Sequence, residues 1–323
     1  MSPDAGASLR IATIGVGHLG RHHARLLRAM PGVTFVAAVD LVAERARAAV
    51  EHSAAEALTD AGALAGRVDA VTIAVPTAGH LAVARPFLER GVHVLVEKPM
   101  TRTSREAAEL NELAARRGLK LQVGHVERFN NALLSAREGL TAVRFIECHR
   151  LAPFKGRGAD VNVILDLMIH DLDVILSLVG AKPVNVSAVG IPVLTDDVDI
   201  ANARIEFANS AIANVTASRA STSAQRMVRV FQPNQYVAID FGGGEVRRVT
   251  RTGAPSEGMA ALKSESWNLE KGDALLAETR SFVDAIVEDR PCEVSGEDGY
   301  AALALAEQII AEIEKRSGER LST

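Results

Sequence analysis

The segment 164–179 reads ILDLMIHDLDVILSLV and is largely apolar. Polar side chains recur in it at spacings of four, three and four residues, at Asp166, His170, Asp173 and Ser177. Side chains at these spacings share one face of a helix. A polar face on a buried helix is unfavourable unless its groups are paired or face a wet cavity, and ionisable groups in such a cavity are typical of active sites. The segment therefore predicts either an acid–base site or buried polar groups satisfied by their neighbours.

A glycine motif, Gly15-Val16-Gly17-His18-Leu19-Gly20, follows the apolar run RIATIGV and precedes the helical pattern RHHARLLRAM. A G-x-G-x-x-G sequence between a strand and a helix is typical of dinucleotide sites. The first glycine permits the tight turn, the second lets a pyrophosphate approach the backbone, and the third lets helix and strand pack closely. The helix N-terminus then offers free N–H groups to the phosphates. The alternative is that the glycines serve only the turn.

An acidic residue, Asp40, ends the next apolar run, TFVAAVD, twenty residues after the last glycine of the motif. At this place a carboxylate binds the ribose 2′-hydroxyl of NAD and repels the 2′-phosphate of NADP. The sequence therefore predicts NAD as the cofactor. Arg45 would weaken this preference.

Two further strand ends carry polar residues, at Val75-Pro76-Thr77, with His80 beyond, and at Val96-Glu97-Lys98-Pro99. Ligands of open parallel sheets bind at the carboxyl ends of the strands, so Lys98 is expected at the mouth of the cofactor cleft. An isolated surface lysine is usually a solvated charge. Beside a nicotinamide, a partly desolvated lysine can instead exchange protons near neutral pH, which makes Lys98 a catalytic candidate.

A basic, glycine-rich stretch, LAPFKGRGADVNV, precedes the first segment. Together with Arg150 it brings Lys155 and Arg157 into one loop. Such a loop could hold an anionic substrate such as a diphosphate. A solvated basic loop fits the composition equally well.

The elements that must position these residues fall into two groups. Up to residue 124, short Val/Ile/Ala-rich runs alternate with amphipathic helical patterns, which predicts an α/β domain, 1–124, with a doubly wound parallel sheet. From residue 125 the runs are longer, rich in β-branched residues and separated by turn signals, which predicts a mainly antiparallel open sheet in a second, α+β domain, 125–323. An open sheet leaves one face for a partner subunit, so a homo-oligomer, a dimer or tetramer through that sheet, is expected.

The C-terminal part of the chain predicts amphipathic helices over 275–288 and 297–315, with Ser295 and Asp298 as the N-terminal cap of the second helix. The preceding stretch 250–272 is polar and irregular and is expected to be a loop that carries the single tryptophan, Trp267.

The composition excludes several classes of function. The 323 residues carry a net charge of −4 without a long run of one sign, so no nucleic-acid partner is expected. The two cysteines, Cys148 and Cys292, lie too far apart to form a metal-spaced pair and are expected to be free thiols, and no metal site is predicted. No apolar run reaches membrane-spanning length and the N-terminus lacks signal-peptide features, so a cytoplasmic protein without a membrane partner is expected.

Three motifs in this order resemble the glucose–fructose oxidoreductase / inositol dehydrogenase / rhizopine-catabolism (Gfo/Idh/MocA) family. They are Gly15-x-Gly17-x-x-Gly20-x-x-His23, Glu97-Lys98-Pro99 and Asp166-x-x-x-His170. The resemblance spans essentially the whole chain. It implies an N-terminal Rossmann domain, an α+β domain with an open antiparallel sheet that often mediates oligomerisation, and the NAD(P)-dependent oxidation or reduction of a sugar or cyclitol hydroxyl.

The resemblance also implies roles for single residues. Lys98 becomes the catalytic lysine that orients and polarises the reacting hydroxyl, His170 the acid/base, and Asp166 a helper; whether Lys98 or His170 is the base stays open. The predicted cofactor contacts are Gly15, Gly17, His18, Leu19, Gly20, Asp40, Pro76, Thr77, His80, Glu97 and Lys98. The predicted substrate contacts are Lys98, Arg128, Arg150, Arg157, Asp166 and His170. The Lys98–Pro99 peptide is often cis in this family, whereas Asp173 and Ser177 receive supporting roles, and Asp171 is expected to pair with an arginine.

A narrower resemblance is carried by GHVERFNN, HRLAPFKGR and LDLMIHDLD, which are similar to the branch of UDP-N-acetylglucosamine 3-dehydrogenases and related nucleotide-sugar enzymes. It implies a UDP-N-acetylhexosamine, oxidised at C3, as the substrate. A dehydrogenase of a free sugar or inositol, and a non-catalytic NAD-binding sensor on the same fold, are the alternatives. The presence of Lys98, Asp166 and His170 argues against the sensor.

Overall fold

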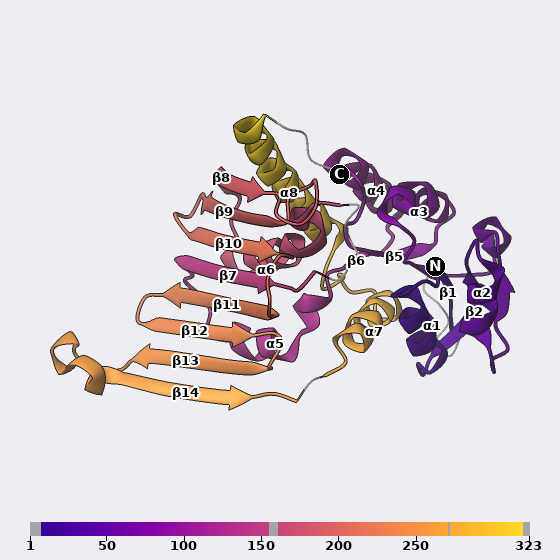
Figure 1. Ribbon diagram of the computed structural model, residues 1–323. Helices are drawn as coiled ribbons and strands as arrows, with labels where there is room; N and C mark the ends of the chain where they lie inside the picture. Colours follow the sequence, from indigo (N-terminus) through magenta and orange to yellow (C-terminus); the bar gives the residue numbers. More distant parts are fainter. Residues whose placement is uncertain (1–7, 155–160, 271, 319–323) are drawn as a thin grey trace. The chain divides into compact units, whose positions relative to one another are not determined.

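The structure is a computed structural model that describes residues 8–154, 161–270 and 272–318 (Figure 1). The chain forms two compact units. The first comprises the chain up to Val126 and the segment Asp273–Tyr300, and the second comprises Glu127–Gly272 and the chain from Ala301 onward. The predicted boundary at residue 124 lies close to the first of these breaks. The return of Asp273–Tyr300 to the first unit differs from the expected continuous second domain.

The first unit contains a six-stranded parallel sheet with the strand order β3-β2-β1-β4-β5-β6, which is the order of a dinucleotide-binding doubly wound fold. Its strands are β1 (Leu9–Ile14), β2 (Val33–Val39), β3 (Glu56–Leu58), β4 (Ala70–Ile73), β5 (His93–Glu97) and β6 (Leu121–Gly124). Its helices are α1 (Gly20–Arg28), α2 (Ala43–Val50), α3 (His80–Glu89), α4 (Ser104–Arg117) and α7 (Ala274–Val287). The central strands β1, β4 and β5 are almost wholly buried, as the continuous apolar runs predict.

Helix α7 explains why the late segment returns to the first unit. Its apolar residues Phe282, Val283 and Ile286 join one core cluster with residues of β1, α1 and β5. The following chain is bonded to the sheet edge, because the N–H of Val123 in β6 donates to the carbonyl of Val294 at 3.1 Å. Burial of these side chains against the sheet, rather than sequence order, decides the unit to which this segment belongs.

The second unit contains an eight-stranded sheet with the order β14-β13-β12-β11-β7-β10-β9-β8, antiparallel except for the parallel pair β7–β10 (Figure 1). Its strands are β7 (Phe145–Leu151), β8 (Pro183–Ile191), β9 (Ile200–Phe207), β10 (Ile212–Ser218), β11 (Gln225–Gln232), β12 (Gln235–Asp240), β13 (Glu245–Arg251) and β14 (Leu262–Asn268). Helix α5 (Asn131–Arg137) packs on β12 and β13, and α6 (Ile169–Val179) packs on β7 and β10. The predicted α/β and α+β architecture is confirmed.

The stretch 250–272, expected to be a loop, contains strand β14, so that expectation was wrong for its second half. The strand pairs antiparallel with β13, with Trp267 opposite Val246, and the guanidinium of Arg248 lies 5.2 Å from the centre of the Trp267 ring. Most of β14 is polar and exposed, because it is an edge strand held by its ladder and not by core packing.

The last helix, α8 (Gly296–Ser317), begins as expected with a reciprocal cap. The Asp298 carboxylate accepts the Ser295 N–H at 2.8 Å, and the Ser295 hydroxyl accepts the Asp298 N–H at 3.2 Å. Among the described residues, no helix is both long and apolar enough to cross a membrane.

Candidate functional site

The glycine motif forms the turn between β1 and α1, and each glycine has a distinct reason to lack a side chain. Gly15 has φ +81°, and a Cβ there would lie 2.7 Å from the backbone of Ala74. A Cβ on Gly20 would lie 1.8 Å from the carbonyl oxygen of Gly15, so helix and strand could not approach as they do. Around Gly17 nothing lies within 4 Å of the Cβ position. This open backbone is what a pyrophosphate needs for close approach.

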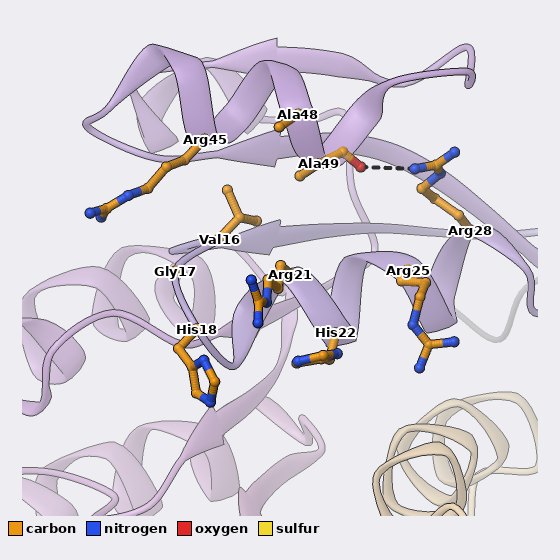
Figure 2. A pocket seen from close by; sticks show the side chains of 10 residues that line it. All are labelled: Val16, Gly17, His18, Arg21, His22, Arg25, Arg28, Arg45, Ala48 and Ala49. Atoms are coloured by element: carbon orange, nitrogen blue, oxygen red, sulfur yellow. Dashed lines mark hydrogen bonds between the residues drawn. The ribbon is translucent and has the colours of Figure 1, made fainter. Parts of the chain in front are cut away.

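A cavity of about 760 Å³ opens beside this turn, between α1 and α2 (Figure 2). It is lined by Val16, Gly17, His18, Arg21, His22, Arg25, Arg28, Arg45, Ala48 and Ala49. Four of these residues are arginines. Burial, together with the positive charges of Arg21 and Arg25, lowers the pKa of His22. Arg28 is committed to the protein, since it donates to the carbonyl of Ala49 at 3.1 Å, but the cavity as a whole is positive. A positive cavity at a helix N-terminus suits the phosphates of a dinucleotide.

The predicted ribose-binding acid, Asp40, lies directly after β2 beside the glycine turn. One carboxylate oxygen accepts the N–H of Val16 at 3.0 Å and the other accepts the N–H of Val42 at 2.9 Å. The guanidinium of Arg45 lies 4.0 Å from the same carboxylate. The structure therefore places an acidic and a basic side chain together at the position where the sequence predicts the ribose contact.

The strand end after β4 carries Pro76, which is exposed, and Thr77, which is half-buried. His80, expected to line the nicotinamide, is buried, and its two ring nitrogens each lie 2.9 Å from a backbone carbonyl oxygen, of Val75 and of Pro99. Burial lowers the pKa of His80, although the two carbonyls oppose this shift. The ring connects the strand end after β4 to the turn after β5. The cofactor contact expected of His80 stays a prediction.

Lys98 lies at the carboxyl end of β5, half-buried, and the Lys98–Pro99 peptide is cis, as the resemblance implies. The preceding Glu97 is buried, and its Oε1 lies 2.8 Å from Nε2 of His23. The other oxygen, Oε2, accepts the N–H of Lys98 at 3.3 Å. Glu97, also an expected cofactor contact, thus holds the lysine-bearing turn from inside the first unit.

The acid–base segment of the second unit is not one continuous α-helix. Residues Ile164–Met168, which include Asp166, form a π-helical turn, and α6 starts at Ile169 just before His170. The side-chain amide oxygen of Asn162 accepts the N–H groups of Ile164 and Leu165, both at 3.1 Å, and so caps the turn. A π-turn changes the spacing of side chains along the helix and is frequent at functional sites. Asp166 and His170 are both half-buried, and their catalytic roles stay predictions.

Two predicted substrate residues are members of buried ion pairs within the second unit. Arg150 is 4% exposed; it donates to both oxygens of Asp171 at 2.9 Å and to Glu127 at 2.9 Å. Although burial lowers the pKa of Arg150, the two carboxylates raise it overall. Arg128 is 5% exposed and lies 3.3 Å from Asp173. These arginines are bound by carboxylates in the core of the second unit, and their assignment to substrate stays a prediction. The expected pairing of Asp171 with an arginine is confirmed.

The remaining predicted residues divide by where they lie. Ser177 donates to the carbonyl of Val174 at 2.8 Å, a local helix contact that agrees with its supporting role. Lys155 and Arg157 lie outside the described residues.

Sequence reasoning missed Glu278, which is fully buried on α7 near His23 and Glu97. The sequence contained a signal for this residue. Glu278 lies four residues before Phe282 on the apolar side of its helix, where an acidic side chain is exceptional. The arginines of α1 were missed as well, although Arg21, Arg25 and Arg28 repeat at helical spacing directly after the glycine motif.

Comparison with family models gives two matches that together cover most of the chain. Residues 9–125 match an oxidoreductase family with an NAD-binding Rossmann fold, and residues 140–234 match the GFO/IDH/MocA C-terminal domain. The first match confirms NAD as the cofactor.

Individual relatives are similar over two thirds of the chain or more. The chain is 40% identical over 307 residues, 95% of the chain and 97% of the relative, to UDP-N-acetylglucosamine 3-dehydrogenase of Acidithiobacillus ferrooxidans. A solved structure of that enzyme from the same species has a TM-score of 0.88 at 39% identity, covering 95% of this chain and 98% of the other. The scyllo-inositol 2-dehydrogenase (NAD(+)) of Bacillus subtilis is 30% identical over 241 residues, 66% of the chain and 68% of the relative. The scyllo-inositol dehydrogenase of Lactobacillus casei, solved with NAD(H) and scyllo-inositol, shares the fold with a TM-score of 0.81 at 20% identity, covering 96% of this chain and 98% of that one.

Proposed function

Because the chain belongs to the Gfo/Idh/MocA family of oxidoreductases, we propose that it is an NAD-dependent dehydrogenase that oxidises the C3 hydroxyl of UDP-N-acetylglucosamine or a closely related UDP-N-acetylhexosamine. The observation that carries this proposal is the 40% identity to a UDP-N-acetylglucosamine 3-dehydrogenase, which extends over 95% of the chain and 97% of the relative. The residues of both catalytic motifs are present in the sequence: Lys98 in the first unit, and Asp166 and His170 in the second.

The first unit offers the features that NAD requires. The backbone at Gly17 is open to a pyrophosphate, the arginine-lined cavity beside it is positive, and Asp40 supplies a carboxylate for a ribose hydroxyl. When bound, NAD supplies the hydride acceptor of the reaction. The protein has to hold the cofactor and the sugar in a reactive orientation and to manage the hydroxyl proton.

In the proposed reaction, the Lys98 ammonium donates a hydrogen bond to the reacting oxygen and stabilises the negative charge that develops on it as the C–H bond breaks. His170 accepts the hydroxyl proton, and Asp166 assists in orienting the sugar or the imidazole. In the reverse direction His170 returns the proton to the carbonyl oxygen. Since Arg128 and Arg150 are engaged by carboxylates in the core, we do not assign them to the diphosphate of the substrate.

A second candidate function is the oxidation of a free cyclitol. It is favoured by the 30% identity to a scyllo-inositol 2-dehydrogenase, although this match covers only 66% of the chain. The two candidates differ in the uridine diphosphate of the substrate, which the first requires and the second lacks.

The experiment that separates them measures NADH formation by absorbance with a panel of substrates at equal concentration. The panel contains UDP-N-acetylglucosamine, UDP-N-acetylgalactosamine, UDP-glucose, free N-acetylglucosamine, scyllo-inositol and myo-inositol. We expect the highest kcat/KM for a UDP-N-acetylhexosamine and a 3-keto product by NMR. Turnover of an inositol with none of the UDP-sugars would replace the proposal by the second candidate. Binding of NAD without turnover of any compound would indicate a sensor.

We propose in addition that the chain forms a homo-oligomer through the sheet of the second unit. Strand β8 at one edge of this sheet exposes apolar side chains, with Val184 64%, Val189 49% and Ile191 52% exposed. Apolar side chains grouped on one strand favour burial by another subunit. Light scattering coupled to size exclusion should give a dimer or tetramer, and Val189→Glu should shift it toward the monomer; a monomeric wild type would contradict the proposal.

A further inference from the structure

Three ionisable side chains meet in the interior of the first unit. They come from three elements: His23 from α1, Glu97 from the end of β5 and Glu278 from α7. His23 and Glu278 are 0% exposed and Glu97 is 6% exposed. One side-chain nitrogen or oxygen of each lies within 4.8 Å of those of the other two. The cluster adjoins Lys98 along the chain, yet the proposed reaction uses none of its members.

The contact between His23 and Glu97 requires a proton in addition to the one on Nδ1 of His23. The Nδ1 of His23 lies 3.4 Å from the hydroxyl oxygen of Thr279, and that hydroxyl donates its proton to the carbonyl of Leu275 at 2.7 Å. Nδ1 therefore has to be the donor toward Thr279. The 2.8 Å contact between Nε2 and the Glu97 carboxylate then needs a second proton. Whether that proton belongs to the ring or to the carboxyl group, the pair is neutral overall.

Glu278 is the third member and is held differently. Among the described residues, neither of its carboxylate oxygens has a hydrogen-bond partner, and both are buried. His23 and Glu97 lie near its carboxylate, and the uncharged side-chain amide of Gln122 from β6 donates to its backbone carbonyl at 3.1 Å. An ionised carboxylate without hydrogen bonds in such a place is strongly disfavoured. Burial, and then the charge of Glu97, raise the pKa of Glu278 well above its ordinary value.

The cluster contacts the backbone of Lys98 through Glu97. The Oε2 of Glu97 accepts the N–H of Lys98, and a Cβ on Gly124 would lie 2.7 Å from that same oxygen. The carboxylate is thus fixed on one side by the lysine backbone, on the second by His23 and on the third by the bare backbone of β6. A carboxylate oxygen of Glu278 lies within 4.8 Å of a Glu97 carboxylate oxygen in the same interior.

We propose that Glu278 is a positioning residue for Lys98: it is kept as a neutral carboxylic acid and, together with His23, holds the Glu97 carboxylate in the orientation that fixes the lysine-bearing turn. The proposal rests on the proposed function in so far as Lys98 is the catalytic lysine. It gives the return of α7 to the first unit a consequence for function, since α7 brings this acid to the end of β5.

The test compares Glu278→Gln, which keeps the shape and neutrality of the acid, with Glu278→Ala, which removes it. We expect kcat of Glu278→Gln to stay within about twofold of wild type, with an unchanged pH profile. In Glu278→Ala, kcat should fall by about tenfold or more with little change in the KM for NAD, as small misplacements of catalytic groups produce. Glu288→Gln, at an exposed site that directly follows the same helix, is the matched control. If Glu278→Gln loses as much activity as Glu278→Ala, the carboxylate is needed in its charged form and the proposal is wrong.

A second measurement does not depend on substrate or on the stability of the alanine variant. Below about pH 4 the acid is protonated in both folded and unfolded chains. At higher pH only the folded chain retains the proton, so the wild type loses stability as pH rises, whereas glutamine has no proton to lose. The Tm of Glu278→Gln relative to wild type should therefore increase between about pH 4 and pH 8. A Tm difference that does not increase between these pH values would contradict a neutral acid.

The alternative occupant of such a cluster is a divalent cation. In that case EDTA would lower the Tm and activity of the wild type, zinc would restore them, and Glu278→Gln would abolish the response; this result would overturn the proposal. Failure of the proposed function gives a different result. If Lys98→Ala stays active, Lys98 is not the catalytic lysine, but the pH-dependent Tm difference between Glu278→Gln and wild type remains.

Discussion

The carboxylate of Asp40 accepts the backbone N–H of Val16 at 3.0 Å, so the acid that follows β2 is bonded directly to the glycine turn that follows β1. The same carboxylate also accepts the N–H of Val42, and Arg45 lies 4.0 Å away. Two N–H groups and a guanidinium thus converge on one negative charge. We expect that arrangement to set the preference between the two nicotinamide cofactors.

Replacement of Asp40 by serine should shift the cofactor preference toward NADP. The substitution removes the charge that repels a 2′-phosphate and leaves the N–H of Val16, the N–H of Val42 and Arg45 to bind it. We expect the ratio of kcat/KM for NADP to that for NAD to rise by about 100-fold, or about 2.7 kcal/mol, from steady-state rates with both cofactors. Glu44→Gln, an exposed acid of α2, is the control and should leave the ratio unchanged. An unchanged ratio in Asp40→Ser would mean that the specificity lies elsewhere.

Lys98→Ala and His170→Ala should each lower kcat by about 10²–10⁴-fold, the usual contribution of a positioned acid or base. Binding of NAD, measured by titration calorimetry, should change by less than about threefold, because the glycine turn and Asp40 are untouched. Lys263→Ala, at a side chain 62% exposed on β14, controls for the loss of a lysine. Near-normal turnover in either of the two variants would remove that residue from the mechanism.

Arg150→Met should destabilise the protein rather than weaken substrate binding. The change leaves Asp171 and Glu127 buried without their common cation, a situation that lowers the free energy of unfolding by about 3–5 kcal/mol. Unfolding in urea measures this loss. The double variant with Asp171→Leu should recover part of it, because one of the two orphaned charges is then removed. A stable Arg150→Met protein with a strongly raised KM for the substrate would restore the original assignment of Arg150 to substrate binding.

The parts of the site that the sequence predicted are those whose chemistry is local in the chain. The glycine turn, the acid after β2 and the lysine after β5 each depend on one strand end and a few neighbouring residues. The strand order follows from the same alternation of elements, because right-handed crossovers leave few arrangements of a parallel sheet. For these features the sequence pattern and the structure agree.

The parts that were missed depend on contacts between distant segments. Asp171 was expected to pair with an arginine, but the basic composition around Arg150 gave no sign that this arginine is its partner, bound through Nε and one terminal nitrogen. Glu278 lies 181 residues after Glu97, and the packing of Phe282, Val283 and Ile286 into the core of the first unit brings its helix there. The π-turn at Ile164–Met168 likewise depends on hydrogen bonding that apolar periodicity does not encode.

A buried carboxylate of the second unit should govern part of the stability at acid pH. Asp199 is 0% exposed; it accepts the N–H groups of Val193 and Thr195, both at 2.8 Å, and the Nε of Arg219 at 2.7 Å. Although burial raises the pKa of Asp199, these donors lower it overall. A lowered pKa in the folded state means that the stabilisation is present above the ordinary value of about 4 and is lost as pH falls toward the folded value.

Asp199→Asn should therefore lower the free energy of unfolding by about 3 kcal/mol near neutral pH, since Arg219 is left buried without its anion. The difference from wild type should shrink as pH falls below about 4, where the unfolded wild-type carboxylate becomes protonated and the advantage of the ionised form fades. Urea unfolding at a series of pH values measures both effects. Asp196→Asn, at an exposed position of the same loop, should show neither. A difference that stays constant or grows toward acid pH would show that Asp199 is not the stabilising anion of this loop.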